Sequence, residues 1–155
     1  MVEEFVIKLA TLEDMKDVFN LSNDSVVRMN SINPEPIIWE NHINWFKNKI
    51  KDKNSIFYII NDSLNNFMGY VRLDREDDWV LTIHLKNEYR GKGLGQRILQ
   101  KICTLNADKC IIALVKENNL ASLNSFKKAE FRETDFVFIR NERYHKLKYE
   151  CNCNK

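Results

Sequence analysis

A cluster of glycines between an apolar segment and an amphipathic segment is the part of the sequence best suited to binding a ligand. Residues 90–95 read Arg-Gly-Lys-Gly-Leu-Gly and hold three of the four glycines in the 155-residue chain. Glycine lets the backbone adopt a positive φ and approach a ligand closely, and the N–H groups at the start of a helix bind anions. Arg90 and Lys92 add two positive charges. We therefore expect this segment, called here the glycine turn, to hold the pyrophosphate of a ligand.

Two well-known nucleotide-binding motifs do not fit the glycine turn. Counted from Gly91, a dinucleotide-binding motif would need its third glycine at residue 96, which is Gln96. A Walker loop needs a glycine followed by Lys-Ser or Lys-Thr, and the sequence contains neither. A plain turn that binds nothing is the remaining alternative, but such a turn needs one glycine and no flanking cations.

Arg90, Gly93 and Gly95 do fit the pattern [RQ]-x-x-G-x-[GA], and residues 85–95 resemble the strand-to-loop signature of the GNAT superfamily of N-acetyltransferases. Asn87 stands where that signature usually has a proline. Residues 119–131 resemble the second CoA-binding motif of the family, with Glu130 in place of a glycine. The resemblance implies acetyl-CoA as the acyl donor, no metal, and a cofactor-binding set of Ile83, His84, Leu85, Arg90, Gly91, Lys92, Gly93, Leu94, Gly95, Gln96, Asn119, Ser122, Phe126 and Lys128.

Acyl transfer from a thioester to an amine needs a base for the ammonium group and a proton for the leaving thiolate. His84 is the candidate base, and Thr82, two residues earlier on the same strand face, can order a water. Phe126 stands where many family members have a tyrosine that protonates the thiolate. Water, a nearby hydroxyl such as Ser125, or unassisted departure must replace that tyrosine. The alternatives are a strand histidine with no catalytic task for His84 and a plain helix cap for Asn119.

Residues 23–31, 38–46 and 69–74 resemble a narrower GNAT branch that acetylates amino groups of nucleotide-linked sugars, including the 4-amino-sugar acetyltransferases of pseudaminic acid biosynthesis. The resemblance implies a nucleotide-linked amino sugar as the acceptor. Arginines suit its diphosphate, and Trp45 and Tyr70 offer faces to a sugar or uracil. A core position is the alternative for Trp45. The expected substrate-binding residues are Arg28, Asn30, Ser31, His42, Trp45, Arg72 and Asp74.

Hydrophobic periodicity and turn signals predict the elements that carry these residues. The expected strands are 5–9, 56–60, 67–73, 79–85, 110–115, 131–138 and 144–149, and the expected helices are 11–21, 36–51, 94–106 and 118–128. This order is that of the GNAT fold. We therefore expect an α+β (mixed α/β) single domain over residues 1–150, followed by a flexible tail at 151–155. Its mostly antiparallel sheet of about seven strands would be flanked by about four helices and splayed in the middle to admit acyl-CoA.

The composition is that of an ordinary globular protein, with 44% hydrophobic and 30% charged residues. The net charge of +2 is too small to predict nucleic acid as a partner. The sequence offers neither a signal-peptide pattern nor an apolar run of membrane-spanning length, so we expect a cytoplasmic protein without a membrane partner. Cys103 and Cys110 are expected as buried thiols, and Cys151 and Cys153 as thiols of the tail.

The predicted function is direct transfer of an acetyl group from acetyl-CoA to an amino group. Two other functions stay open at this stage: a protein or peptide N-acetyltransferase on the same fold, and a catalytically silent acyl-CoA-binding module. The sequence also leaves open whether the chain forms a homodimer.

Overall fold

The computed structural model describes residues 4–149, which form a mixed α/β fold with a seven-stranded, mostly antiparallel sheet. The strand order is β1-β2-β3-β4-β5-β7-β6. The described chain divides into two compact units, the first of residues 4–74 and 82–89 and the second of residues 75–81 and 90–149. Strand β4 (Trp79–Leu85) contributes to both units. The predicted fold class is confirmed, with five α-helices where about four were expected.

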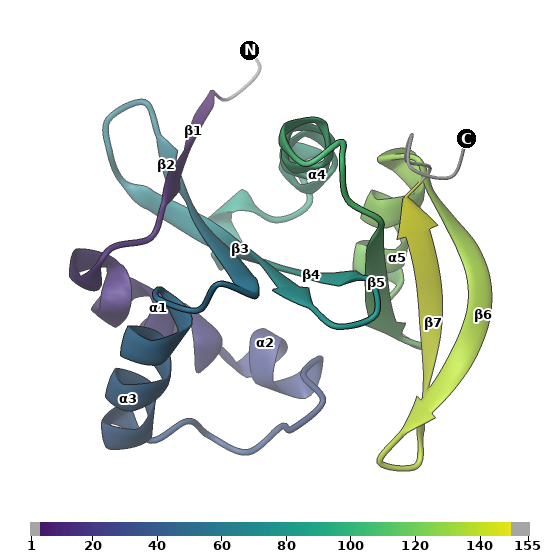
Figure 1. Ribbon diagram of the computed structural model, residues 1–155, viewed down its shortest axis with the longest axis horizontal. Helices are drawn as coiled ribbons and strands as arrows, with labels where there is room; N and C mark the ends of the chain where they lie inside the picture. Colours follow the sequence, from purple (N-terminus) through teal and green to yellow (C-terminus); the bar gives the residue numbers. More distant parts are fainter. Residues whose placement is uncertain (1–3, 150–155) are drawn as a thin grey trace. The chain divides into compact units, whose positions relative to one another are not determined.

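The first unit joins a strand ladder to three helices. Strand β1 pairs antiparallel with β2, and β2 pairs antiparallel with β3, as Figure 1 shows. The Lys86 N–H donates to the Met68 carbonyl at 2.9 Å, next to the end of β4. The elements are β1 (Phe5–Leu9), a 3-10 turn (Leu12–Asp14), α1 (Met15–Ser22), α2 (Ser25–Met29), α3 (Trp39–Lys49), β2 (Ser55–Asp62), β3 (Phe67–Arg75), the carboxyl-terminal part of β4 and a second 3-10 turn (Asn87–Tyr89).

Two boundaries in the first unit differ from the sequence prediction for local reasons. Residues 25–29 were expected to be irregular, but the Asp24 carboxylate accepts from the Val26 and Val27 N–H groups and so caps the short helix α2. Helix α3 begins at Trp39 and not near Pro36, because the Ile37 N–H and carbonyl are both bonded to the Asn23 side chain. Residues 30–38 connect α2 to α3 and are called here the α2–α3 connection.

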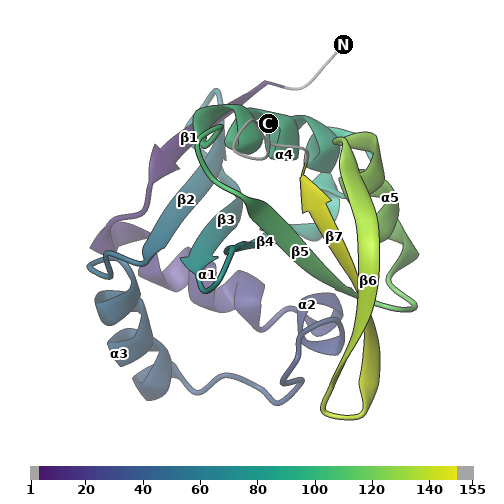
Figure 2. The same ribbon diagram turned by 45° about the vertical axis from the view of Figure 1, so that its right-hand side comes forward.

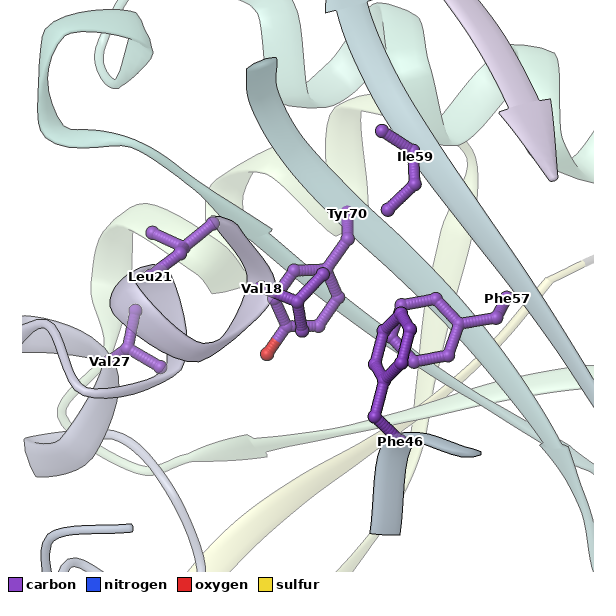
Figure 3. Close-up of a cluster of buried hydrophobic side chains, with 7 residues drawn as sticks. All are labelled: Val18, Leu21, Val27, Phe46, Phe57, Ile59 and Tyr70. Atoms are coloured by element: carbon purple, nitrogen blue, oxygen red, sulfur yellow. The ribbon is translucent and has the colours of Figure 1, made fainter. Parts of the chain in front are cut away.

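The core of the first unit lies between its helices and its strands. Figure 3 shows this cluster, in which side chains from the three helices meet side chains from β2 and β3. The buried members are Val18, Leu21, Val27, Phe46, Phe57, Ile59 and Tyr70. Burying this much apolar surface is the main reason the helices stay on the strands.

The second unit contains the glycine turn and the carboxyl-terminal hairpin. Strand β4 pairs in parallel with β5 at Trp79–Ile111 and Val80–Ile112, while β7 pairs antiparallel with both β5 and β6 (Figure 2). The hairpin turns at Arg140 and Asn141, which both have positive φ, as a tight two-residue hairpin turn requires. The elements are the first part of β4, α4 (Leu94–Leu105), β5 (Ile111–Lys116), α5 (Leu120–Lys128), β6 (Phe131–Ile139) and β7 (Glu142–Tyr149).

Two predictions from composition can be compared with the described residues. Cys103 is buried and free, as expected, but Cys110 is half-buried and disulfide-bonded, so the prediction of a buried free thiol is wrong for Cys110. Cys151 and Cys153 lie outside the described residues. Between residues 4 and 149, every helix is too short or too polar to cross a membrane.

Candidate functional site

The glycine turn has the backbone geometry that its composition predicts. Gly91 has φ of +72° and Gly93 has φ of +77°, a left-handed conformation that side chains other than glycine rarely adopt. Gly93 is the N-cap of α4 and provides no side chain to the first turn of the helix. Apart from the adjoining residues of the chain, no heavy atom of the described residues lies within 4 Å of a Cβ built at either glycine. The turn thus bares the amino end of a twelve-residue helix, which is an arrangement that binds anions.

Gly95 lies where α4 packs against α5. A Cβ at Gly95 would make an ordinary contact of 3.5 Å with Ser125 Oγ, so this helix contact does not itself require a glycine. The next residue of α4, Gln96, donates through Nε2 to the Lys128 carbonyl of α5 at 3.3 Å. These contacts place Gln96 and Ser125 at a helix–helix contact. Lys128 is exposed and takes part through its backbone.

The other predicted residues of the glycine turn flank this backbone. Arg90 is half-buried and Lys92 is exposed, whereas Leu94 is buried and anchors the first turn of α4. The turn therefore carries two charged side chains, and the apolar side chain of Leu94 fixes the start of α4 directly after them.

Helix α5 begins with a capping asparagine and ends in a strained turn. Asn119 Oδ1 accepts from the Ser122 N–H at 3.3 Å, so the helix-cap role weighed for Asn119 is present. Phe126 is buried, with its ring 4.9 Å from that of Phe131 in an edge-on contact. Glu130 has φ of +74°, which explains why the family motif has a glycine at this position. Phe126 is thus part of the core, with no hydroxyl to offer.

Strand β4 carries the two candidate residues for proton transfer. Thr82 and His84 alternate with Ile83 and Leu85, so they share one face of the strand. The His84 ring is half-buried, and its centre lies 5.4 Å from the Tyr70 ring in an edge-on contact. Ile83 is half-buried and Leu85 is buried. The first unit therefore holds His84 against β3.

Arg28 was expected to face a diphosphate, but it is occupied inside the first unit. Its guanidinium donates to the Ser22, Asn33 and Glu35 carbonyls at 2.7, 2.8 and 3.0 Å, and to Ser31 Oγ at 3.0 Å. Ser31 Oγ in turn donates to the Val27 carbonyl at 2.6 Å. The structure thus brings Arg28 of α2 together with Ser31 of the α2–α3 connection.

Asn30 is the predicted substrate residue that begins this connection. It is the C-cap of α2, where its N–H donates to the carbonyls of the preceding turn, and its side chain is half-buried.

Arg72, Asp74 and Trp45 form a second group of predicted acceptor residues. Arg72 Nε donates to Asp74 Oδ2 at 2.6 Å, and its guanidinium lies 5.1 Å from the centre of the Trp45 ring. Lys49 and Ser55 donate to Asp74 Oδ1 at 3.1 and 2.9 Å. Burial raises the pKa of Asp74, but the Arg72 charge and these hydrogen bonds outweigh it and hold the pKa below its usual value.

The Trp45 side chain is 36% exposed and borders an open pocket of about 430 Å³. The rest of the pocket lining comes from the end of α3 and the turn after it, namely Asn48, Lys49, Lys51 and Asp52. Trp45 is therefore partly a packing residue, against Phe57, and partly a surface residue.

His42 and Tyr70, which were expected to contact a sugar nucleotide, are buried. His42 Nε2 donates to the Met15 carbonyl at 3.0 Å, and burial lowers the pKa of His42 although that hydrogen bond partly offsets it. The Tyr70 hydroxyl is 2.8 Å from Ser22 Oγ, and burial raises its pKa. Both side chains thus hold α1 and α3 on the strands, and neither offers a face to a ligand.

Sequence reasoning missed several residues that hold these groups in place. Lys49 binds Asp74, and helical spacing predicts its position, since it follows Trp45 by four residues on α3. Ser22 and Asn23 had no such signal, because their partners Tyr70 and Ile37 are distant in sequence. No cluster of three or more His, Cys, Asp or Glu side chains that can hold a metal occurs within residues 4–149.

Solved structures with the same fold include several acetyltransferases. Spermidine N-acetyltransferase from Vibrio cholerae, bound to CoA and spermine, is 16% identical and superposes with a TM-score of 0.83 over 93% of this chain and 94% of the other. An aminoglycoside acetyltransferase bound to ribostamycin and coenzyme A is 16% identical, with a TM-score of 0.80 over 95% and 93%. A domain from Methanocaldococcus jannaschii is 22% identical, with a TM-score of 0.77 over 95% and 99%.

A search of curated protein sequences found no match. The model of a protein family described as acetyltransferase (GNAT) domain matches residues 5–132, which is most of the chain. This match confirms the predicted enzyme class, an N-acetyltransferase that takes its acetyl group from acetyl-CoA. The glycine turn, the order of the elements and the family match lead to one conclusion: the chain belongs to the GNAT family of acetyltransferases.

Proposed function

We propose that this protein transfers the acetyl group of acetyl-CoA directly to an amino group of a nucleotide-linked amino sugar. The observation that carries the donor half of the proposal is the open left-handed turn at Gly91 and Gly93 before α4. Its backbone N–H groups, with the charges of Arg90 and Lys92, suit the pyrophosphate of acetyl-CoA. The cap residue Asn119 and the exposed Lys128 of α5 belong to the same proposed donor site.

The proposed chemistry uses few protein groups, because a thioester is already activated. His84 takes a proton from the ammonium form of the acceptor, directly or through a water held by Thr82, and the neutral amine attacks the thioester carbonyl carbon. An N–H group of Ile83, His84 or Leu85 stabilises the oxyanion. The attacking nitrogen then gives its second proton to water, the C–S bond breaks, and the thiolate takes a proton from water or from Ser125, which water reprotonates. Phe126 has no proton to give.

The charges of the proposed acceptor residues favour an anionic acceptor over a polyamine. Asp74 is the single carboxylate among these residues, and Arg72 and Lys49 already neutralise it. A cationic acceptor such as spermine or ribostamycin, the ligands of the two acetyltransferase neighbours, would find no unpaired carboxylate in this group. The Trp45 indole and the exposed Lys51 of the same pocket suit a nucleotide, whose base stacks and whose phosphates bind cations.

Thiol release from acetyl-CoA in the presence of different amines tests the proposal. The panel contains a UDP-linked 4-amino sugar, spermidine, ribostamycin and a basic peptide. We expect kcat/KM for the UDP-linked sugar to exceed that for each other amine by about tenfold or more. A higher kcat/KM for spermidine, ribostamycin or the peptide would overturn the acceptor assignment. Tight acetyl-CoA binding without turnover of any amine would favour a silent acyl-CoA-binding module.

A further inference from the structure

We infer that Arg28 is a positioning residue, which gives the α2–α3 connection the shape that the acceptor meets, and is not itself a ligand of the acceptor. That an acceptor meets this connection rests on the proposed function. That Arg28 holds the connection in place rests only on hydrogen bonds within the first unit.

Most N–H groups of the Arg28 guanidinium already donate hydrogen bonds to the protein. Arginine has five N–H groups, and four are used here, on the carbonyls of Ser22, Asn33 and Glu35 and on Ser31 Oγ. Two of these carbonyls belong to an irregular segment, residues 31–35, that has no strand or helix partner of its own. The segment is therefore wound around the side chain, which replaces the backbone partners that a regular element would supply.

To bind a diphosphate, Arg28 would need at least two N–H groups that are not already used. Recognition of a phosphate by arginine is strongest when two parallel N–H groups face the same anion. With four N–H groups committed, only one remains for any ligand.

A second side chain, that of Asn23, also holds the α2–α3 connection in place. Asn23 donates through Nδ2 to the Ile37 carbonyl at 2.9 Å and accepts the Ile37 N–H on Oδ1 at 2.8 Å. Arg28 thus holds the middle of the connection and Asn23 holds its end.

A series of contacts leads from Arg28 to His84, the candidate base. Ser22, whose carbonyl Arg28 binds, contacts the Tyr70 hydroxyl, and the Tyr70 ring contacts His84. A change at residue 28 should therefore act on the acceptor side of the reaction.

The test compares Arg28→Lys with the parent and with Arg75→Lys, an exposed arginine at the end of β3. Lysine keeps the charge but has one ammonium in place of the planar fork, so it cannot reach four separated acceptors. The first readout is amide hydrogen exchange within residues 31–37, where Ser31, Ile32, Asn33, Glu35 and Ile37 carry the N–H groups, and it needs no substrate. We expect exchange there to become about tenfold faster in Arg28→Lys, and to stay unchanged in Arg75→Lys.

The second readout separates positioning from a general loss of structure. With the UDP-linked 4-amino sugar as acceptor, we expect Arg28→Lys to raise the acceptor KM by about tenfold while the KM for acetyl-CoA stays within about twofold. Asn23→Ala should speed exchange at Ile37 and raise the same KM.

Unchanged exchange in Arg28→Lys, with or without a raised acceptor KM, would overturn the inference, since Arg28 would then act as a direct ligand or not at all. Faster exchange with an unchanged acceptor KM would also overturn it. If the UDP-linked sugar is not a substrate, the proposed function fails, and the same KM comparison is made with whichever amine of the panel is acetylated.

Discussion

Gly69 of β3 packs directly against the backbone carbonyl oxygen of His84 in β4. A Cβ built at Gly69 would overlap that oxygen and would lie 2.9 Å from Leu85 Cδ2. The φ of Gly69 is not of the left-handed kind, so the glycine is needed for close approach and not for backbone conformation. This contact fixes the distance between β3 and the part of β4 that carries the candidate base.

Gly69→Ala should therefore destabilise the protein. The methyl group must displace backbone atoms of β4, and we expect the free energy of unfolding to fall by about 2 kcal/mol. Chemical denaturation monitored by tryptophan fluorescence measures the change. The matched control is Gly95→Ala, whose Cβ would make an ordinary 3.5 Å contact with Ser125 Oγ. That variant should be as stable as the parent, or more stable by up to about 1 kcal/mol, because alanine favours helix. Equal effects of the two changes would contradict the overlap.

Gly93→Asn should weaken CoA binding while leaving the fold intact. Asparagine tolerates a positive φ better than other side chains, so the free energy of unfolding should stay within about 1 kcal/mol of the parent. Its side chain would, however, occupy the open space in front of α4, and we expect CoA affinity to drop about tenfold or more. Titration calorimetry measures the affinity. Parent-like affinity in a folded variant would show that CoA does not use this turn.

Glu130→Gly should stabilise the protein. Glu130 has a φ of +74° at the end of α5, a conformation that costs a residue with a Cβ about 1 kcal/mol relative to glycine. Relief of that strain exceeds the extra flexibility that glycine gives the unfolded chain, so the melting temperature should rise. Glu130→Ala is the control, since it removes the carboxylate but keeps the strain. A rise of the same size in Glu130→Ala would assign the effect to charge.

The stability of the protein should decrease as the pH falls below the ordinary pKa of histidine, 6.5, through the buried His42. Burial holds the folded pKa of His42 below that value, so the unfolded chain takes up a proton first and acid favours unfolding. The contribution is fully present above pH 6.5 and is lost progressively below it. His42→Gln keeps an N–H donor for the Met15 carbonyl and does not titrate.

Denaturation curves of parent and His42→Gln between about pH 7.5 and pH 5 test this sign. The difference in free energy of unfolding between the two proteins should change across this range in favour of the variant. If the free energy of unfolding changed with pH in the same way in the parent and in His42→Gln, His42 would not be the titrating group.

Local features of the sequence predicted the conformation of the glycine turn. A positive φ at Gly91 and Gly93 and a helix start after them are properties of a few neighbouring residues, and periodicity marks strands and helices over short windows. The fold class and the family therefore follow from the sequence.

The tertiary structure decided which polar side chains face inward. Arg28, His42, Tyr70 and Asp74 have residue types that suit a ligand equally well, and their partners lie at other places in the chain: Asn33, Met15, Ser22 and Lys49. Burying a charge or a hydrogen-bonding group is costly unless a partner is present, and only the folded chain brings the partner. Sequence alone thus predicted the conformation of the glycine turn, where we propose that acetyl-CoA binds, whereas only the folded chain brought to Arg28 the carbonyl groups that it binds.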